Sequence, residues 1–508
     1  MTTDPNVSIQ VLRDVAVPLG DGTITRAEVW LPAGGGAHPA ILTRTIVPVD
    51  GPPTLQPLMD ARLATSRGYA VVLQEVRGRG ASEGAYEPFV NEAADGADSI
   101  AWIAEQAWCD GRVVMTGASV LGAAQWLAAS ASPPALRAIA PTISSDELSE
   151  GWSLTGGVPE HGFLSTWSAV TLAPLGERWL DDTERALDDL EGLTRIAPWI
   201  PDWYGPADSD YWARLSVSAR REQVEVPAFV AGGWYDIFLA GTLASFARSR
   251  DPRDRLVIGP WGHDPFLSWL IGDVNAGIAG AGLGRLFGWQ LDFYDAVLAG
   301  REQDAPRVRA YAMNARRWLA LDTWPPPGAS TSTITLAAAG FGVDPADPVP
   351  SRGGRGFTPG LPDDGWGVRD QRPTAARADV VEAAAITLEE ATLLAGPVTA
   401  HLSIAADGEG ACLWTGTLCH EQPDGALHNL CDGVVTAAAD AGEVELSLGH
   451  VCVALPAGAR LVLLVAGSSF PRWPRPAHAR TQSLREGGQL ELTVAPHELL
   501  DSHALADA

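Results

Sequence analysis

Short apolar runs alternate with amphipathic segments along the first third of the chain. The runs have the length and composition of buried strands, and the segments between them repeat apolar positions with helical spacing. Alternation of this kind predicts a mostly parallel sheet with helices on both faces. The predicted strands lie at 39–43, 69–74 and 113–115, the helices at 58–67 and 91–108, and an antiparallel hairpin precedes them at 7–31.

The alternation stops at about residue 146 and resumes at 226. Tryptophans and acidic helical segments crowd the intervening stretch, which predicts a helical cap inserted over the sheet. A buried strand then leads to Asp236, a helix covers 238–248, and another strand leads to His263. From about residue 330, short strands separated by turn-forming residues predict a β-sandwich of jelly-roll type.

Ser119 lies where the strand at 113–115 gives way to a helix rich in alanine and leucine. The small residues Gly117 and Gly122 allow a sharp strand-to-helix turn that exposes the serine hydroxyl. The first helical amide, that of Val120, would then face an oxyanion formed at this serine. The spacing Gly-x-Ser-x-x-Gly is also compatible with a non-catalytic serine in a glycine-rich turn, so the motif needs support from elsewhere in the chain.

Asp236 and His263 supply that support, because each follows one of the later buried strands. In α/β-hydrolases the nucleophile, the acid and the base occur in the chain order Ser, Asp, His, on loops at the carboxyl end of the sheet. Ser119, Asp236 and His263 match this order and placement, and we predict that they form a catalytic triad. The alternatives are an aspartate that caps a helix and a histidine that is hydrogen-bonded in the core.

The fold class that follows is an α/β-hydrolase with an inserted helical cap and a C-terminal β-sandwich. The predicted division assigns 1–145 and 226–329 to the α/β-hydrolase, 146–225 to the cap and 330–508 to the jelly-roll.

Composition narrows the choice of partners and chemistry. The net charge of −27 argues against nucleic acid and anionic membranes as partners, and mildly favours cationic substrates. The chain has no lysine, which excludes a Ser–Lys dyad and a Schiff-base lysine.

No apolar run approaches a membrane span, the N-terminus does not resemble a signal peptide, and the five cysteines fit buried thiols in a reducing cytoplasm. We therefore expect a cytoplasmic protein with no cofactor and no metal.

Several motifs make the chain resemble the cocaine esterase / X-Pro dipeptidyl-peptidase family of serine hydrolases. The resemblance runs nearly end to end, through Arg-Gly-Arg-Gly-Ala-Ser-Glu-Gly at 77–84 and the segments 102–103, 106–112, 117–122, 233–236, 259–263, 344–350, 370–373, 431–433 and 468–471. It implies the same three-part fold and hydrolysis of an ester or amide through an acyl-enzyme on Ser119, with His263 as base and Asp236 orienting it.

The sequence departs from the family at the second oxyanion donor. Members usually carry Arg-Thr-Pro-Tyr after the early strand, where the tyrosine hydroxyl completes the oxyanion hole; here the segment reads Arg-Thr-Ile-Val at 44–47. Val47 has no side-chain donor, and the loss of one oxyanion donor typically costs about 10²–10³ in turnover. We expect the second donor, if present, near Thr45 and Val47 or on the cap.

Three classes of function remain open from sequence. The first is a serine carboxylesterase or amidase acting on a small molecule, including X-Pro dipeptidyl-peptidase or α-amino-acid ester hydrolase specificity. The second is a non-hydrolytic relative, an acyltransferase or an eliminating lyase, and the third is a binding protein with a degenerate site. A homodimer is also left open.

Two sets of residues are candidates for substrate contacts. Trp152, Trp167 and Phe238 are the candidates for the walls of the substrate pocket. An aminopeptidase-like specificity would need a carboxylate for the substrate ammonium group, and the cap offers Asp146, Glu147, Glu150 and Glu160.

Overall fold

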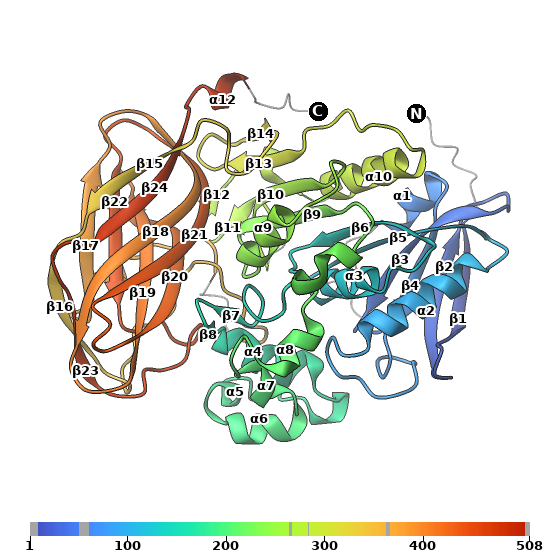
Figure 1. Ribbon diagram of the computed structural model, residues 1–508, viewed down its shortest axis with the longest axis horizontal. Coiled ribbons are helices and arrows are strands. Elements are labelled where there is room, and N and C mark those ends of the chain that lie inside the picture. The colour runs from blue at the N-terminus through green and yellow to red at the C-terminus, as the bar shows by residue number, and fades with distance from the viewer. Residues whose placement is uncertain (1–8, 50–59, 264–266, 283, 362–365, 503–508) are drawn as a thin grey trace.

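The computed structural model describes residues 9–49, 60–263, 267–282, 284–361 and 366–502. Figure 1 shows three parts: a large sheet with its helices, a cluster of short helices below it, and a strand-rich region at the C-terminal end. The first two residues of the predicted hairpin lie outside the described residues.

A ten-stranded sheet forms the first part, with the order β1-β2-β4-β3-β5-β6-β9-β10-β13-β14. Neighbouring strands from β4 to β13 are parallel, whereas β1, β2 and β14 pair antiparallel at the two edges. The predicted, mostly parallel sheet is therefore confirmed. Its strands are Gln10–Pro18 (β1), Ile24–Leu31 (β2), His38–Thr45 (β3), Ala70–Glu75 (β4), Cys109–Ala118 (β5), Leu136–Thr142 (β6), Phe229–Tyr235 (β9), Arg255–Gly262 (β10), Val308–Ala312 (β13) and Arg317–Leu321 (β14).

Five helices pack against this sheet. Arg67, at the end of α1, forms ion pairs with Asp292 and Asp295 of α10, which joins these two helices. Gly96 of α2 lies against Ala128 of α3, so that α2 and α3 pack together. The helices are Ala61–Ser66 (α1), Glu92–Ala104 (α2), Val120–Ser130 (α3), Leu239–Ala247 (α9) and Arg285–Leu298 (α10). Among the described residues, none of the helices has the length and apolarity needed to span a membrane.

Between β6 and β9 the chain forms the cap. Its tryptophans Trp152, Trp203 and Trp212 are almost fully buried, which shows that they pack the short cap helices together. The helix α4 continues into a π-helical segment, a feature with no signal in the sequence. The elements are Leu154–Thr155 (β7), Val158–Pro159 (β8), His161–Trp167 (α4), the π-helix Ser168–Leu172, Arg185–Asp188 (α5), Leu190–Ile196 (α6), Ile200–Trp203 (α7) and Asp210–Leu215 (α8), with short 3₁₀ turns at Leu175–Glu177 and Ser218–Gln223.

The C-terminal part consists of two antiparallel sheets, as expected for the predicted sandwich. One has the order β15-β24-β18-β23-β16 with β21 also paired to β18, and the other has the order β17-β22-β19-β20. The strands are Ser330–Thr335 (β15), Ala339–Val343 (β16), Val380–Thr387 (β17), Thr392–Ala406 (β18), Ala411–Glu421 (β19), Leu427–Ala438 (β20), Glu443–Leu455 (β21), Arg460–Ala466 (β22), Arg480–Leu484 (β23) and Gln489–Ala495 (β24).

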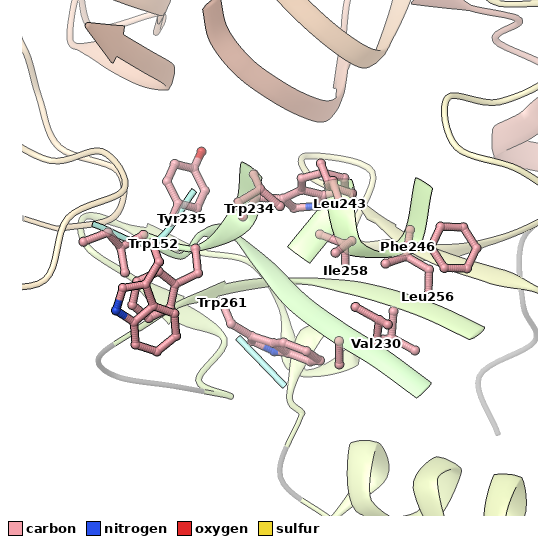
Figure 2. Packing of buried hydrophobic residues seen from close by; sticks show 14 of the residues in the cluster. Trp152, Val230, Trp234, Tyr235, Leu243, Phe246, Leu256, Ile258 and Trp261 are labelled. Atoms are coloured by element: carbon pink, nitrogen blue, oxygen red, sulfur yellow. The ribbon is translucent and has the colours of Figure 1, made fainter. Parts of the chain in front are cut away.

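Two features join the large sheet, the cap and the C-terminal part: a shared apolar core and a buried set of ion pairs. Figure 2 shows the apolar core beside β9 and β10, where Val230, Leu256 and Ile258 lie close to one another. The cap and the sandwich are joined by Arg472, which pairs with Glu160 of the cap and Asp432 of β20 while all three side chains are buried. The cap is thus fixed to both neighbours, because its tryptophans belong to the same apolar core.

Candidate active site

Ser119 occupies a strained turn between β5 and α3. Its φ of 58° and ψ of −128° are unusual for a residue with a side chain, and they direct the chain sharply from strand to helix. The flanking glycines have no room for a side chain: a Cβ on Gly117 would lie 2.6 Å from Leu121 Cβ, and one on Gly122 would lie 2.6 Å from Ser144 Cβ. The local geometry is therefore that of a nucleophile elbow.

Asp236 and His263 are joined by a hydrogen bond at the ends of two neighbouring parallel strands. The distance from His263 Nδ1 to Asp236 Oδ1 is 2.7 Å. Asp236 is fully buried, and its second oxygen, Oδ2, accepts the backbone N–H of Phe238 at 3.0 Å. A carboxylate that accepts the Nδ1 proton leaves Nε2 of the imidazole as the acceptor, which is the tautomer a general base needs.

The serine lies at the same end of the sheet as this pair, the carboxyl end of its parallel strands, since β5, β6, β9 and β10 are consecutive and parallel. Its backbone N–H donates to the carbonyl of Thr142 at the end of β6. In the part of the chain that the structure describes, no hydrogen bond joins the Ser119 hydroxyl to His263. Contacts of this type often tighten only in the complex with substrate, so the arrangement is compatible with a triad.

The oxyanion side of the site offers one clear donor. As the first residue of α3, Val120 has an N–H with no partner within the helix. The donors expected near Thr45 and Val47 are occupied by each other: the Val47 N–H donates to Thr45 Oγ1 at 3.1 Å, and the Thr45 hydroxyl donates to the Val47 carbonyl at 3.2 Å. The structure therefore gives no support to Thr45 or Val47 as the second donor.

The three aromatic residues predicted to line the pocket lie in one cluster next to His263. Trp152 stacks on Phe238, with ring centroids 3.9 Å apart, and its ring also lies 6.1 Å from that of Trp167. The Phe238 ring meets the His263 imidazole edge-on at 5.1 Å. All three side chains are nearly fully buried, so they pack mainly against each other.

Two further rings of this cluster had not been identified from the sequence. Phe163 of α4 stacks on Trp167 at 5.1 Å, and Phe357, from the segment between β16 and β17, lies 4.3 Å from the His263 ring. Apolar positions at helical spacing in 161–167 could have indicated Phe163. No local signal could have indicated Phe357, because its contact depends on how the C-terminal part packs against the sheet edge.

The four cap acids considered for an ammonium site all have partners within the protein. Asp146 pairs with Arg248, and Glu160 pairs with Arg472. The remaining two accept hydrogen bonds from neighbouring groups, Glu147 from the hydroxyls of Ser216 and Ser218 and Glu150 from the backbone N–H groups of Gly156 and Gly157. Each of these four carboxylates therefore already has a partner within the protein, and none of the four is left over to bind an ammonium group.

Among the described residues, no group of three or more His, Cys, Asp or Glu side chains is placed to hold a metal ion. The five cysteines are all buried, and burial raises the pKa of the Cys431 thiol to about 12. Burial also raises the pKa of Cys109, Cys419 and Cys452, and these four thiols are not suited to act as nucleophiles because the reactive form is the thiolate.

Comparison with known proteins decides the family. Residues 21–265 match the family model described as X-Pro dipeptidyl-peptidase (S15 family), and residues 300–502 match that of the X-Pro dipeptidyl-peptidase C-terminal non-catalytic domain. A cocaine esterase from Rhodococcus sp. is 31% identical over 95% of this chain and 94% of its own length. The chain belongs to the cocaine esterase / X-Pro dipeptidyl-peptidase family. It is therefore a serine hydrolase and, at the level of the family, an ester hydrolase.

Solved structures agree on the fold of this family member. An aminopeptidase from a marine sediment Thaumarchaeota archaeon matches with a TM-score of 0.80 and 22% identity, covering 97% of both chains. An α-amino acid ester hydrolase matches with a TM-score of 0.80 and 20% identity, covering 97% of this chain and 98% of its own. At these identities the likeness establishes the shared fold, which confirms the predicted α/β-hydrolase class.

Proposed function

We propose that the protein cleaves a small-molecule carboxylic ester or amide through an acyl-enzyme on Ser119. His263 Nε2 takes the hydroxyl proton as Ser119 Oγ attacks the carbonyl carbon, and Asp236 stabilises the imidazolium that forms. The Val120 N–H stabilises the oxyanion of the tetrahedral intermediate. His263 then returns the proton to the leaving group, and water releases the acyl group by the same sequence of steps.

The observation that carries this proposal is the His263–Asp236 hydrogen bond of 2.7 Å. It lies at the carboxyl end of the parallel strands, where the turn at Ser119 is also found. The partly exposed ring of Phe357, 4.3 Å from that of His263, further favours substrates with an apolar group near the reacting carbonyl.

Fluorophosphonate labelling followed by mass mapping of the adduct tests this proposal. We expect stoichiometric labelling at Ser119 and none in Ser119→Ala. A folded wild-type protein that stays unlabelled would refute an activated serine.

A non-hydrolytic reaction is the second candidate, and the occupied donors of Thr45 and Val47 favour it. With Val120 as the one oxyanion donor identified among the described residues, the site would stabilise an oxyanion less well, which would suit slow acyl transfer to an acceptor or an elimination with His263 as base. Product analysis with a supplied amine or alcohol acceptor separates the candidates. Transferred acyl product would favour transfer, an unsaturated product without water uptake would favour elimination, and free acid alone would favour hydrolysis.

A further inference from the structure

A cavity of about 780 Å³ lies beside the turn that contains Val47. Its walls include Ile46 and Val49, which flank this turn, together with the loop after β4, the first two strands and two residues of the cap. The cavity thus adjoins the segment at which the family carries its oxyanion tyrosine. Its lining includes none of the predicted triad residues, so it is not the reaction centre itself, but the turn follows β3, which pairs in parallel with β5, the strand that leads to Ser119.

Two arginines of the cavity wall, Arg79 and Arg178, have no carboxylate partner in the part of the chain that the structure describes. Arg79 is buried and donates to the backbone carbonyls of Ile46, Thr171 and Leu172. Arg178 is partly exposed and donates to the carbonyls of Ala173 and Thr171 through Nε and Nη2. These bonds orient both guanidinium groups but leave their charges unneutralised.

Among the described residues, two of the three acids in the cavity wall pair with other arginines, so that Glu75 is the one wall acid left to offset the charges of Arg79 and Arg178. Glu75 accepts the backbone N–H groups of Val49 and Ala81. The other two acids, Asp14 and Glu28, lie 3.5 Å and 3.7 Å from the other two wall arginines, Arg26 and Arg13. The wall therefore carries four arginines and three acids, although the whole chain has a net charge of −27.

The pKa shifts of Arg79 and Arg178 are consistent with two unneutralised cations close to each other. Burial lowers the pKa of the Arg79 guanidinium, and the nearby Arg178 cation lowers it further. Burial also lowers the pKa of Arg178. Two like charges held close to each other gain from a shared anion, and a planar carboxylate matches the fork geometry of a guanidinium.

We infer that Arg79 and Arg178 form a carboxylate-binding subsite, so that the ester or amide presented to Ser119 carries a carboxylate that reaches into this cavity. The inference rests on the proposed function for the reaction, whereas the anion binding can be tested without turnover.

The first experiment compares kcat/KM for matched esters with wild type and variants. One pair, 4-nitrophenyl hydrogen glutarate and its methyl ester, places the carboxylate on the acyl side; the other, 4-butyryloxybenzoate and its methyl ester, places it on the alcohol side. We expect wild type to prefer the charged member of at least one pair. This preference should fall about tenfold in Arg178→Gln, persist in Arg178→Lys and stay unchanged in Arg195→Gln, a variant of an exposed arginine on α6. A preference absent from both pairs, or equal in Arg178→Gln and wild type, would overturn the inference.

Calorimetric titration with glutarate separates the two proposals. Binding to wild type that is lost in Arg178→Gln would support the subsite even if no ester is cleaved, in which case only the proposed hydrolysis fails. Turnover of neutral esters without any binding of glutarate, and without preference for charged substrates, would leave the hydrolase and remove the subsite. Thermal unfolding of each variant checks that the loss of two hydrogen bonds at the end of the π-helix has not unfolded the cap.

Discussion

Replacement of Asp236 by asparagine should abolish most of the activity without disturbing the fold. The carboxylate has two defined partners: Oδ1 lies 2.7 Å from His263 Nδ1, and Oδ2 accepts the Phe238 N–H at 3.0 Å. Asparagine has the same shape but only one oxygen. Because the Phe238 N–H is a buried donor that needs an acceptor, the amide oxygen should stay on that side. The amide NH₂ must then face His263.

This orientation forces His263 into the wrong tautomer. Nδ1 must accept the amide proton, so the ring proton moves to Nε2, and Nε2 can no longer remove the proton of the Ser119 hydroxyl. The same substitution in a serine protease triad lowers kcat about 10⁴-fold, which corresponds to ~5.5 kcal/mol of transition-state stabilisation. We expect a loss of this size in kcat/KM.

Hydrolysis of a 4-nitrophenyl ester, together with the rate of fluorophosphonate labelling, measures this loss. Asp254→Asn is the matched control, because Asp254 is also buried and accepts a backbone N–H, that of Ala228, but lies at the opposite end of β10. The control should retain its activity. Turnover by Asp236→Asn within tenfold of wild type, in a protein with an unchanged melting temperature, would refute the assigned roles of Asp236 and His263.

Three further predictions test the turn, the elbow and the joint between cap and sandwich. If a tyrosine at position 47 restores the missing donor, Val47→Tyr should raise kcat by 10- to 100-fold over Val47→Phe, and equal rates for the two variants would contradict this. Gly122→Ala should lower the free energy of unfolding by about 1–3 kcal/mol in urea titration, because the new Cβ would meet Ser144, whereas Gly288→Ala on α10 has open space and should be neutral or stabilising. Arg472→Met should lower the free energy of unfolding by about 3–5 kcal/mol, because Glu160 and Asp432 would be left buried and without this partner. The control Arg195→Met removes only an exposed ion pair and should lower the free energy of unfolding by less than about 1 kcal/mol in the same titration.

The features that could be predicted from the sequence are those with a local signature. Ser119, Asp236 and His263 each follow a short apolar strand, and parallel strands bring their carboxyl ends to one edge of the sheet. The chain order of the three residues therefore indicated the site before any contact was known. The tryptophan-rich stretch likewise indicated a packed insertion, and the structure buries Trp152 and Trp167 in the aromatic cluster that also contains Phe238.

What could not be predicted depends on contacts between distant segments or on the fine geometry of a turn. The ring of Phe357 reaches His263 from a segment far along the chain, in a stretch without periodicity. Thr45 and Val47 form hydrogen bonds with each other within a single turn. The backbone geometry of this turn decides whether a donor faces the active site or the backbone, and the sequence does not indicate that geometry. The sequence could identify Val47 as a departure from the family, but not that Thr45 is already engaged.

The net charge of the chain and the charges that line the cavity favour different substrate groups, for a physical reason. The value of −27 sums charges over the whole surface, and at physiological ionic strength exposed charges are screened beyond about 8 Å. A ligand in the cavity beside Val47 is therefore affected mainly by the groups that line it. There Arg79 and Arg178 lack carboxylate partners among the described residues, while Glu75 is held by two backbone amides. The local balance thus favours an anionic substrate group where the overall charge favoured a cationic one, and the paired-ester experiment decides between them.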